Sequence, residues 1–230
     1  MNVNEPSRAL RLWREWRGFV AFVAVMLVFR SAVADWNHVP SGSMEPSILV
    51  GDRIVVDKLA YGLRVPFTHL RLASWNAPHR GDVVTFTSPE DGRLMVKRVI
   101  AVPGDRVSMH RNHLTVNGVS ARYAPVADTR VPIAVPEGFV LYRESLLGSE
   151  RVVMVREDQA ATFAGSFRTV VVPEGQYLML GDNRDRSRDS RMIGFVPREY
   201  VLGRARSVAF SLDYENYYAP RMNRFLADLP

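Results

Sequence analysis

The sequence has no cysteine, which excludes disulfide bonds, thiolate zinc sites, iron–sulfur clusters and a cysteine nucleophile. Lysine is also scarce: of 30 basic residues only Lys58 and Lys97 are lysine, and the rest are arginine. No apolar run reaches the roughly 20 residues that a transmembrane helix needs. The longest, Gly18 to Phe29, has 12 residues. With 47% apolar and 23% charged residues, the composition is that of a globular protein.

The apolar run near the N-terminus is expected to meet a membrane. Extended to residues 18–36 it spans 19 residues, provided that Arg30 reaches the lipid headgroups. Three interpretations compete: an uncleaved anchor, a cleaved signal peptide with an A-x-A site at Ala32-Val33-Ala34, and a buried core helix. The basic residues before the run predict that residues 1–17 are cytoplasmic and that the remainder is outside; they are Arg8, Arg11, Arg14 and Arg17.

The rest of the chain is predicted to be mainly β. From Ile48 onward, short apolar runs alternate with turn signals such as Pro103-Gly104-Asp105 and Asn117-Gly118. No long helical period follows the N-terminal run. Residues 106–173 are more polar and less regular, which favours an insertion between two motif-rich regions. We therefore expect an antiparallel β protein with one N-terminal helix.

Two serines flank a glycine in the segment Pro40-Ser41-Gly42-Ser43-Met44. Glycine permits a tight backbone turn, which can expose a hydroxyl group. The same composition also suits a simple linker that leaves the membrane. The segment by itself does not decide between a nucleophile and a linker.

Lys97 lies within an apolar run, Met95 to Ile100. A lone lysine in a strand usually lies on a solvated face. If it is buried instead, its pKa falls from about 10.4 toward neutrality, and the neutral amine can act as a general base. Arginine cannot do this because it stays protonated. The burial hypothesis explains why this position is lysine in a chain whose other cations are almost all arginine.

Aspartate and arginine alternate in residues 181–191. This composition is compatible with a solvated loop, a metal site or a phosphate site. The interleaved arginines oppose a cation at Asp182, Asp185 and Asp189, and no Walker-type phosphate motif is present. We favour a hydrogen-bonded turn with internal Asp–Arg pairs, and expect no metal and no cofactor.

Taken together, these segments resemble the bacterial type I signal peptidases, or leader peptidases. The resemblance covers Val39 to about Asp213, with 106–173 poorly matched, and both lysines fall inside matching segments. Any one segment is weak support, but five in the family order make chance improbable. The segments are Pro40–Pro46, Gly51–Gly62, Arg80–Phe86, Lys97–Asp105 and Gly181–Arg191, followed by Gly194–Pro197.

The resemblance implies a serine–lysine dyad endopeptidase that removes signal peptides from exported pre-proteins after an A-x-A site. Ser43 matches the nucleophile and Lys97 the general base. Ser41 matches the residue whose hydroxyl joins the Ser43 N–H in the oxyanion hole. Three further positions match supporting residues of the family: Ser187, which orients the lysine, and the ion pair of Asp189 and Arg191.

The family fold implies an antiparallel β catalytic core, residues 37–105 and 174–230, with a smaller inserted β domain at 106–173. The family also implies that 18–36 is an uncleaved anchor in the bacterial inner membrane, with the catalytic domain on the outer side. The partners would be signal peptides and phospholipid, with no nucleic acid. Apolar residues beside the dyad are expected to wall the substrate pockets: Val39, Met44 and Val96.

Two other classes of protein stay open. One is a Ser/Lys self-cleaving, repressor-like regulator, and the other is a membrane-tethered β domain that binds without catalysis. Within the peptidase class, the sequence does not separate a general enzyme from a specialist. Arg186 and Arg188 depart from the family pattern, and we expect their charge to help lower the Lys97 pKa.

Overall fold

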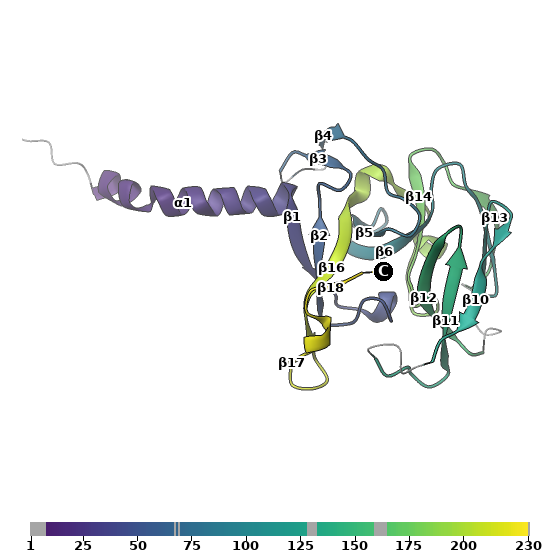
Figure 1. The fold of residues 1–230 in the computed structure, drawn as a ribbon. Coiled ribbons are helices and arrows are strands. Elements are labelled where there is room, and N and C mark those ends of the chain that lie inside the picture. Colours follow the sequence, from purple (N-terminus) through teal and green to yellow (C-terminus); the bar gives the residue numbers. More distant parts are fainter. Residues whose placement is uncertain (1–7, 67, 69, 128–132, 159–164, 230) are drawn as a thin grey trace, which may run out of the picture.

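The computed structural model describes residues 8–66, 68, 70–127, 133–158 and 165–229. Parts of two predicted segments lie outside the described residues: 1–7 of the N-terminal segment, and 128–132 and 159–164 of the insertion. Figure 1 shows one long helix that projects from a body made of strands.

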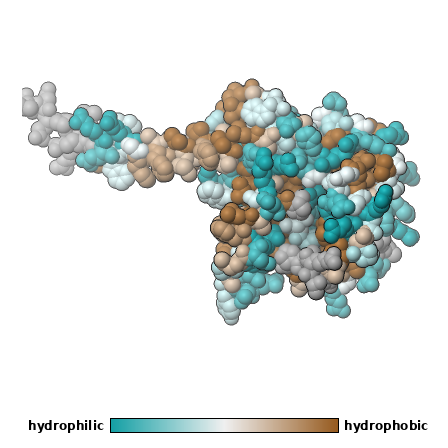
Figure 2. All heavy atoms as spheres, in the orientation of Figure 1, coloured by the Kyte–Doolittle hydropathy of each residue, from teal (hydrophilic) through white to brown (hydrophobic). Residues whose placement is uncertain are grey.

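Helix α1 (Arg8–Ala32) carries the apolar run, and its side chains between Phe19 and Phe29 are exposed. Figure 2 shows this stretch as an apolar band that the described body leaves uncovered on the face in view, with a hydrophilic segment before it. Among the described residues, no helix is both long and apolar enough to cross a membrane.

The helix ends four residues before the predicted limit at Trp36. Lys58 Nζ donates to the Arg30 carbonyl oxygen at 2.7 Å, which gives a partner to one of the carbonyls that a helix end leaves unpaired. Strand β1 (Ala34–His38) follows at once. Residues 34–36 thus belong to a strand and not to the helix, and the limit of the anchor at residue 36 stays a prediction.

The main sheet contains the strands that position the site. Its order is β1-β2-β16-β5-β6-β14-β15, with β17 and β18 paired to β16. All its pairings are antiparallel, which confirms the mainly antiparallel β part of the predicted fold class for the described residues. Besides β1, its members are β2 (Asp52–Asp57), β5 (Val83–Thr87), β6 (Leu94–Ala101), β14 (Gln176–Leu180), β15 (Val196–Pro197), β16 (Val201–Asp213), β17 (Ala219–Pro220) and β18 (Ala227–Asp228).

Three smaller antiparallel sheets and several short helices complete the described chain. One sheet is β3 (Gly62–Arg64) with β4 (Arg71–Ser74); the second is β13 (Phe167–Val171), β7 (Arg106–His110), β8 (His113–Val116) and β9 (Val119–Ser120); the third is β10 (Arg122–Pro125), β11 (Phe139–Leu146) and β12 (Ser149–Arg156). The helices are α2 (Ser190–Ile193) and the 3-10 turns η1 (Gly42–Met44), η5 (Arg198–Tyr200) and η6 (Met222–Arg224).

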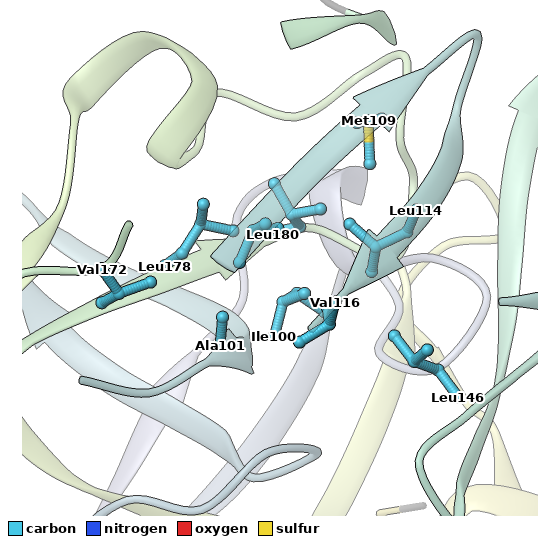
Figure 3. Packing of buried hydrophobic residues seen from close by; sticks show 10 residues of the cluster. Ile100, Ala101, Met109, Leu114, Val116, Leu146, Val172, Leu178 and Leu180 are labelled. Atoms are coloured by element: carbon cyan, nitrogen blue, oxygen red, sulfur yellow. The ribbon is translucent and has the colours of Figure 1, made fainter. Parts of the chain in front are cut away.

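One core cluster joins the predicted insertion to the main sheet. Figure 3 shows Val116 and Leu114 of β8 facing Ile100 of β6 and Leu180 of β14. These side chains are nearly or fully buried, and burial of this kind contributes about 1.5–3 kcal/mol for each large aliphatic side chain. The division of the chain at residues 106 and 173 stays a prediction, but strands on its two sides share this core.

A second core cluster lies under the serine segment. It contains Met44 from the segment, Ile48 that follows it, Ile54 and Val56 from β2, and Val83 from β5. Alternate residues of β2 are buried, as expected for a strand with one face on the core. The cluster fixes η1 against the sheet.

Candidate active site

Ser43 lies in η1 and is held there from both sides. Its own side chain is 8% exposed, and the next residue, Met44, is fully buried in the core. Asn183 holds the turn from the other end of the chain: its backbone N–H donates to the Ser43 carbonyl at 3.2 Å, and its Nδ2 donates to the Gly42 carbonyl at 3.1 Å. The hydroxyl group is thus placed by local turn geometry and by a residue 140 positions away.

Lys97 comes from β6 and meets this hydroxyl directly. Its Nζ lies 2.6 Å from Ser43 Oγ and 2.9 Å from the Val96 carbonyl oxygen. The residue is 3% exposed, so the solvated-face interpretation of Lys97 is wrong. The linker interpretation of the serine segment is wrong as well, because the segment is packed against the core and bonded to a buried amine.

The environment of Lys97 lowers its pKa from 10.5 to about 8. Burial is the main cause, because it penalises the charged form. The Asp189 and Asp182 carboxylates act in the opposite direction, and the Arg191 guanidinium adds to the lowering. Near neutral pH a fraction of this amine is therefore deprotonated and able to accept a proton.

Arg186 and Arg188 were expected to lower the Lys97 pKa, but neither contributes to its shift. Both side chains are engaged elsewhere. Arg188 pairs with Glu90 at 2.7 Å and with Asp91 at 3.2 Å. Arg186 stacks over the Phe139 ring, 4.5 Å from its centroid. The cation that does lower the Lys97 pKa is Arg191.

Asp189 and Arg191 form a buried ion pair at 2.8 Å. Asp189 also caps α2 by accepting from the Arg191 N–H, and it accepts from the Gly181 N–H at 3.0 Å. Burial alone raises the pKa of Asp189, but the bonds from Arg191 and Gly181 hold it below its usual value. A carboxylate that stays ionised is thereby fixed near Lys97.

The other charges of the 181–191 segment find partners outside it. Asp182 binds Arg98 of β6 through two bonds of 2.7 and 2.9 Å, and both side chains are about 1% exposed. Arg184 binds the buried Glu144 of β11 at 2.7 Å. The predicted internal Asp–Arg pairing is thus right for Asp189 and wrong for Asp182 and Arg184. The Arg98 bridge ties the strand of Lys97 to the segment that carries Asp189.

Ser187 and the Ser43 turn lie on either side of Gly181, and both are close to it. A Cβ atom at position 181 would overlap both the Ser187 hydroxyl and the Ser43 carbonyl oxygen, so only glycine fits this contact. Within the described chain, the bonds of Lys97 Nζ do not include Ser187. Its predicted role in orienting the lysine stays a prediction.

A cavity of about 240 Å³ opens beside the Ser43–Lys97 pair. Ser41 lines it, and so do Val39 and Val96, two of the three predicted pocket residues, but the third, Met44, lies outside its lining. That Val39 and Val96 contact the substrate stays a prediction. Met44 points into the core because the turn that exposes the hydroxyl group of Ser43 directs the next side chain inward. The lining also includes residues that the sequence did not single out: Asn37, His38, Pro40, Ile54, Thr85, Leu94 and Met95.

Comparison with known proteins identifies the family to which the chain belongs. A family model described as "Signal peptidase, peptidase S26" matches residues 13–210. The chain belongs to this signal peptidase family.

Several signal peptidases illustrate the relationship. Signal peptidase I of Pseudomonas aeruginosa is 33% identical over 229 residues, covering 91% of this chain and 79% of that protein. Signal peptidase I of Pseudomonas fluorescens is 34% identical over 207 residues, covering 85% and 71%. A crystal structure of a signal peptidase I from Enterococcus faecalis V583 is 32% identical and covers 57% of this chain and 98% of that one, with a TM-score of 0.35.

Membership of the signal peptidase family confirms the predicted resemblance and makes the chain a peptidase of the serine type. Apart from Pro40, the lining residues that the sequence did not single out are ordinary strand positions. Ile54 alternates with half-buried neighbours in β2, and Thr85 lies among buried residues of β5, which marks both as core and not as pocket. These lining residues can be recognised only when it is known which strands are neighbours in the fold.

Proposed function

We propose that this signal peptidase cleaves N-terminal signal peptides from exported pre-proteins, with Ser43 as nucleophile and Lys97 as general base. The observation that carries the proposal is the 2.6 Å approach of Lys97 Nζ to Ser43 Oγ, within reach for direct proton transfer. The lowered Lys97 pKa supports it, because only a neutral amine can accept the proton.

The first half of the reaction forms an acyl-enzyme. Neutral Lys97 takes the proton of the Ser43 hydroxyl as Oγ attacks the scissile carbonyl carbon. The resulting oxyanion would be held by the Ser43 N–H and the Ser41 hydroxyl; Ser41 is exposed at the N-terminus of η1 and lines the cavity. When the C–N bond breaks, the Lys97 ammonium returns the proton to the leaving amine.

The second half releases the signal peptide. Neutral Lys97 removes a proton from water, and the hydroxide attacks the ester carbonyl of the acyl-enzyme. The Ser43–carbonyl bond breaks, and Lys97 returns the proton to Ser43 Oγ. The Asp189–Arg191 pair and Ser187 would hold the lysine and the serine turn in place throughout.

The cavity supports a preference for small residues on the N-terminal side of the cleavage site. Val39, Ile54 and Val96 make its walls apolar, and its volume of about 240 Å³ is limited. In an extended substrate the P1 and P3 side chains point to the same face, so both can enter one cavity. This agrees with cleavage after an A-x-A site.

The exposed apolar band of α1 supports attachment to the cytoplasmic membrane. Arg14 and Arg17 precede the band, and Arg30 follows it. We infer that the band lies in lipid, with these arginines at the headgroups, an N-terminus on the cytoplasmic side and the catalytic body outside. This placement brings Ser43 close to the membrane that holds the signal peptide, which raises the effective substrate concentration.

The decisive experiment measures cleavage of a detergent-solubilised pre-protein with an A-x-A signal peptide. The parent is compared with Ser43→Ala, Lys97→Ala and Lys97→Arg. Lys58→Arg is the matched control, because Lys58 is the other lysine and its partners, the Arg30 carbonyl and Asp35, accept from arginine equally well. We expect Ser43→Ala to abolish cleavage and both Lys97 variants to lose about 10²–10⁴-fold or more.

Two outcomes would contradict this mechanism. If Lys97→Arg cleaves normally, Lys97 is not the base. If the folded parent cleaves none of several pre-proteins, the chain is a specialist or a binding protein. Circular dichroism of each variant separates loss of activity from loss of fold.

A further inference from the structure

One residue that lines the cavity beside Ser43 and Lys97 has a hydroxyl group without a partner in the described part of the chain. Thr85 of β5 lines this cavity and is only 2% exposed. Its Oγ1 is buried and makes no hydrogen bond within the described chain. A buried hydroxyl without a partner lowers the stability of the fold, and valine has nearly the same shape without that cost. The presence of threonine instead of valine at this position therefore suggests that the hydroxyl group has a function.

The strand pairing shows where the Thr85 side chain lies. Side chains alternate along a strand, so Thr85 shares a face with Val83, which packs in the cluster under the serine turn. Across the ladder Thr85 pairs with Val96, which also lines the cavity. The half-buried Asn37 adds a second polar side chain to the same lining. Thr85 and Asn37 thus place polar groups beside the apolar lining residues Val39, Ile54 and Val96.

We propose that Thr85 makes the cavity selective for a small substrate side chain that carries a hydroxyl group, at P1 or at P3. The proposal rests on the proposed function and adds a specificity to it. Serine differs from alanine by one oxygen atom, so it needs little more room. A substrate hydroxyl and Thr85 Oγ1 can each donate and accept, so binding would give the orphaned group its partner.

The test uses three peptides that differ only at P3 and P1: alanine at both, serine at P3, and serine at P1. We measure kcat/KM for each peptide with the parent enzyme, Thr85→Val and Thr85→Ser. Thr87→Val is the matched control, because Thr87 lies on the same face of β5 but outside the cavity lining. We expect the parent to cleave one serine peptide at least as well as the alanine peptide.

The ratio to compare is kcat/KM for the preferred serine peptide divided by kcat/KM for the alanine peptide. Thr85→Val should lower this ratio by about 3- to 10-fold, the effect of one hydrogen bond. Thr85→Ser and Thr87→Val should leave the ratio unchanged. If Thr85→Val does not fold, Thr85→Ala removes the same hydroxyl and should lower the ratio equally.

The proposal is overturned if removal of the hydroxyl leaves both ratios unchanged. It is also overturned if the parent cleaves the alanine peptide and neither serine peptide. A parent that cleaves no peptide and no pre-protein overturns the proposed function itself, which distinguishes the two failures.

Discussion

Lys97 is the residue whose protonation controls the proposed reaction. Its pKa is lowered to about 8, mainly by burial, and only its neutral form can take the Ser43 proton. Well below pH 8 the neutral fraction falls about tenfold per pH unit, so kcat/KM should drop roughly fiftyfold between pH 8 and pH 6. The pH profile of kcat/KM for a short peptide measures this directly.

The acidic limb of this profile is the pH range in which kcat/KM falls as the solution becomes more acidic. Its midpoint identifies the group that acts as the base. His38 also lines the cavity, and its pKa is lowered below 6.5 by partial burial and by Arg53. A limb near pH 8 agrees with Lys97. A limb below pH 6.5 would assign the proton transfer to His38 instead.

Asp189 should set the Lys97 pKa through its charge. The Asp189 carboxylate favours the charged amine, so Asp189→Asn should lower the Lys97 pKa further and move the acidic limb to lower pH. The same change breaks a buried ion pair and should cost roughly 3–5 kcal/mol of stability, measured by denaturant unfolding. Asp185→Asn is the control, because Asp185 bonds to Asn112 and the Arg156 N–H and does not act on Lys97. An unmoved limb in Asp189→Asn would contradict the assignment.

At the scale of elements, the site depends on how closely β14 approaches η1. Gly181 follows β14 and leaves no room for a Cβ between Ser43 and Ser187. We expect Gly181→Ala to displace the serine turn and lower kcat/KM by about 10²-fold, because catalysis is sensitive to displacements near 1 Å. Gly18→Ala adds a methyl group with no neighbour within 4 Å and should leave kcat/KM unchanged. Equal activity of the two variants would show that the contact is dispensable.

The elements themselves could be predicted because their signals are local. Short apolar runs separated by turn signals marked β2, β5, β6, β8 and β14 in the sequence. The contact of Ser43 with Lys97 joins residues 54 positions apart, and only the family resemblance placed them together. Partners such as Glu144 for Arg184, and Glu90 for Arg188, depend on which strands become neighbours, and no local pattern encodes that.

The whole molecule combines a projecting apolar helix with a basic chain of net charge +6. Anionic headgroups attract such a chain, with about 1 kcal/mol for each arginine near the surface. The apolar band of α1 has no partner within the described protein, and lipid would cover it. Membrane attachment and catalysis should therefore be separable by changes confined to α1.

Replacing Phe22 and Leu27, which are 62% and 51% exposed, with glutamate tests this separation. We expect the double variant to lose most of its co-sedimentation with anionic vesicles, because two charges oppose burial of the band in lipid. Its kcat/KM for a short soluble peptide in detergent should stay within about twofold of the parent, since surface changes remote from a site seldom alter it. Cleavage of a membrane-inserted pre-protein should fall with the lost local concentration. The apolar double variant Phe22→Leu with Leu27→Ile should behave as the parent in all three assays. Vesicle binding that survives the two glutamates would place the membrane contact elsewhere on the protein and leave α1 without its proposed role.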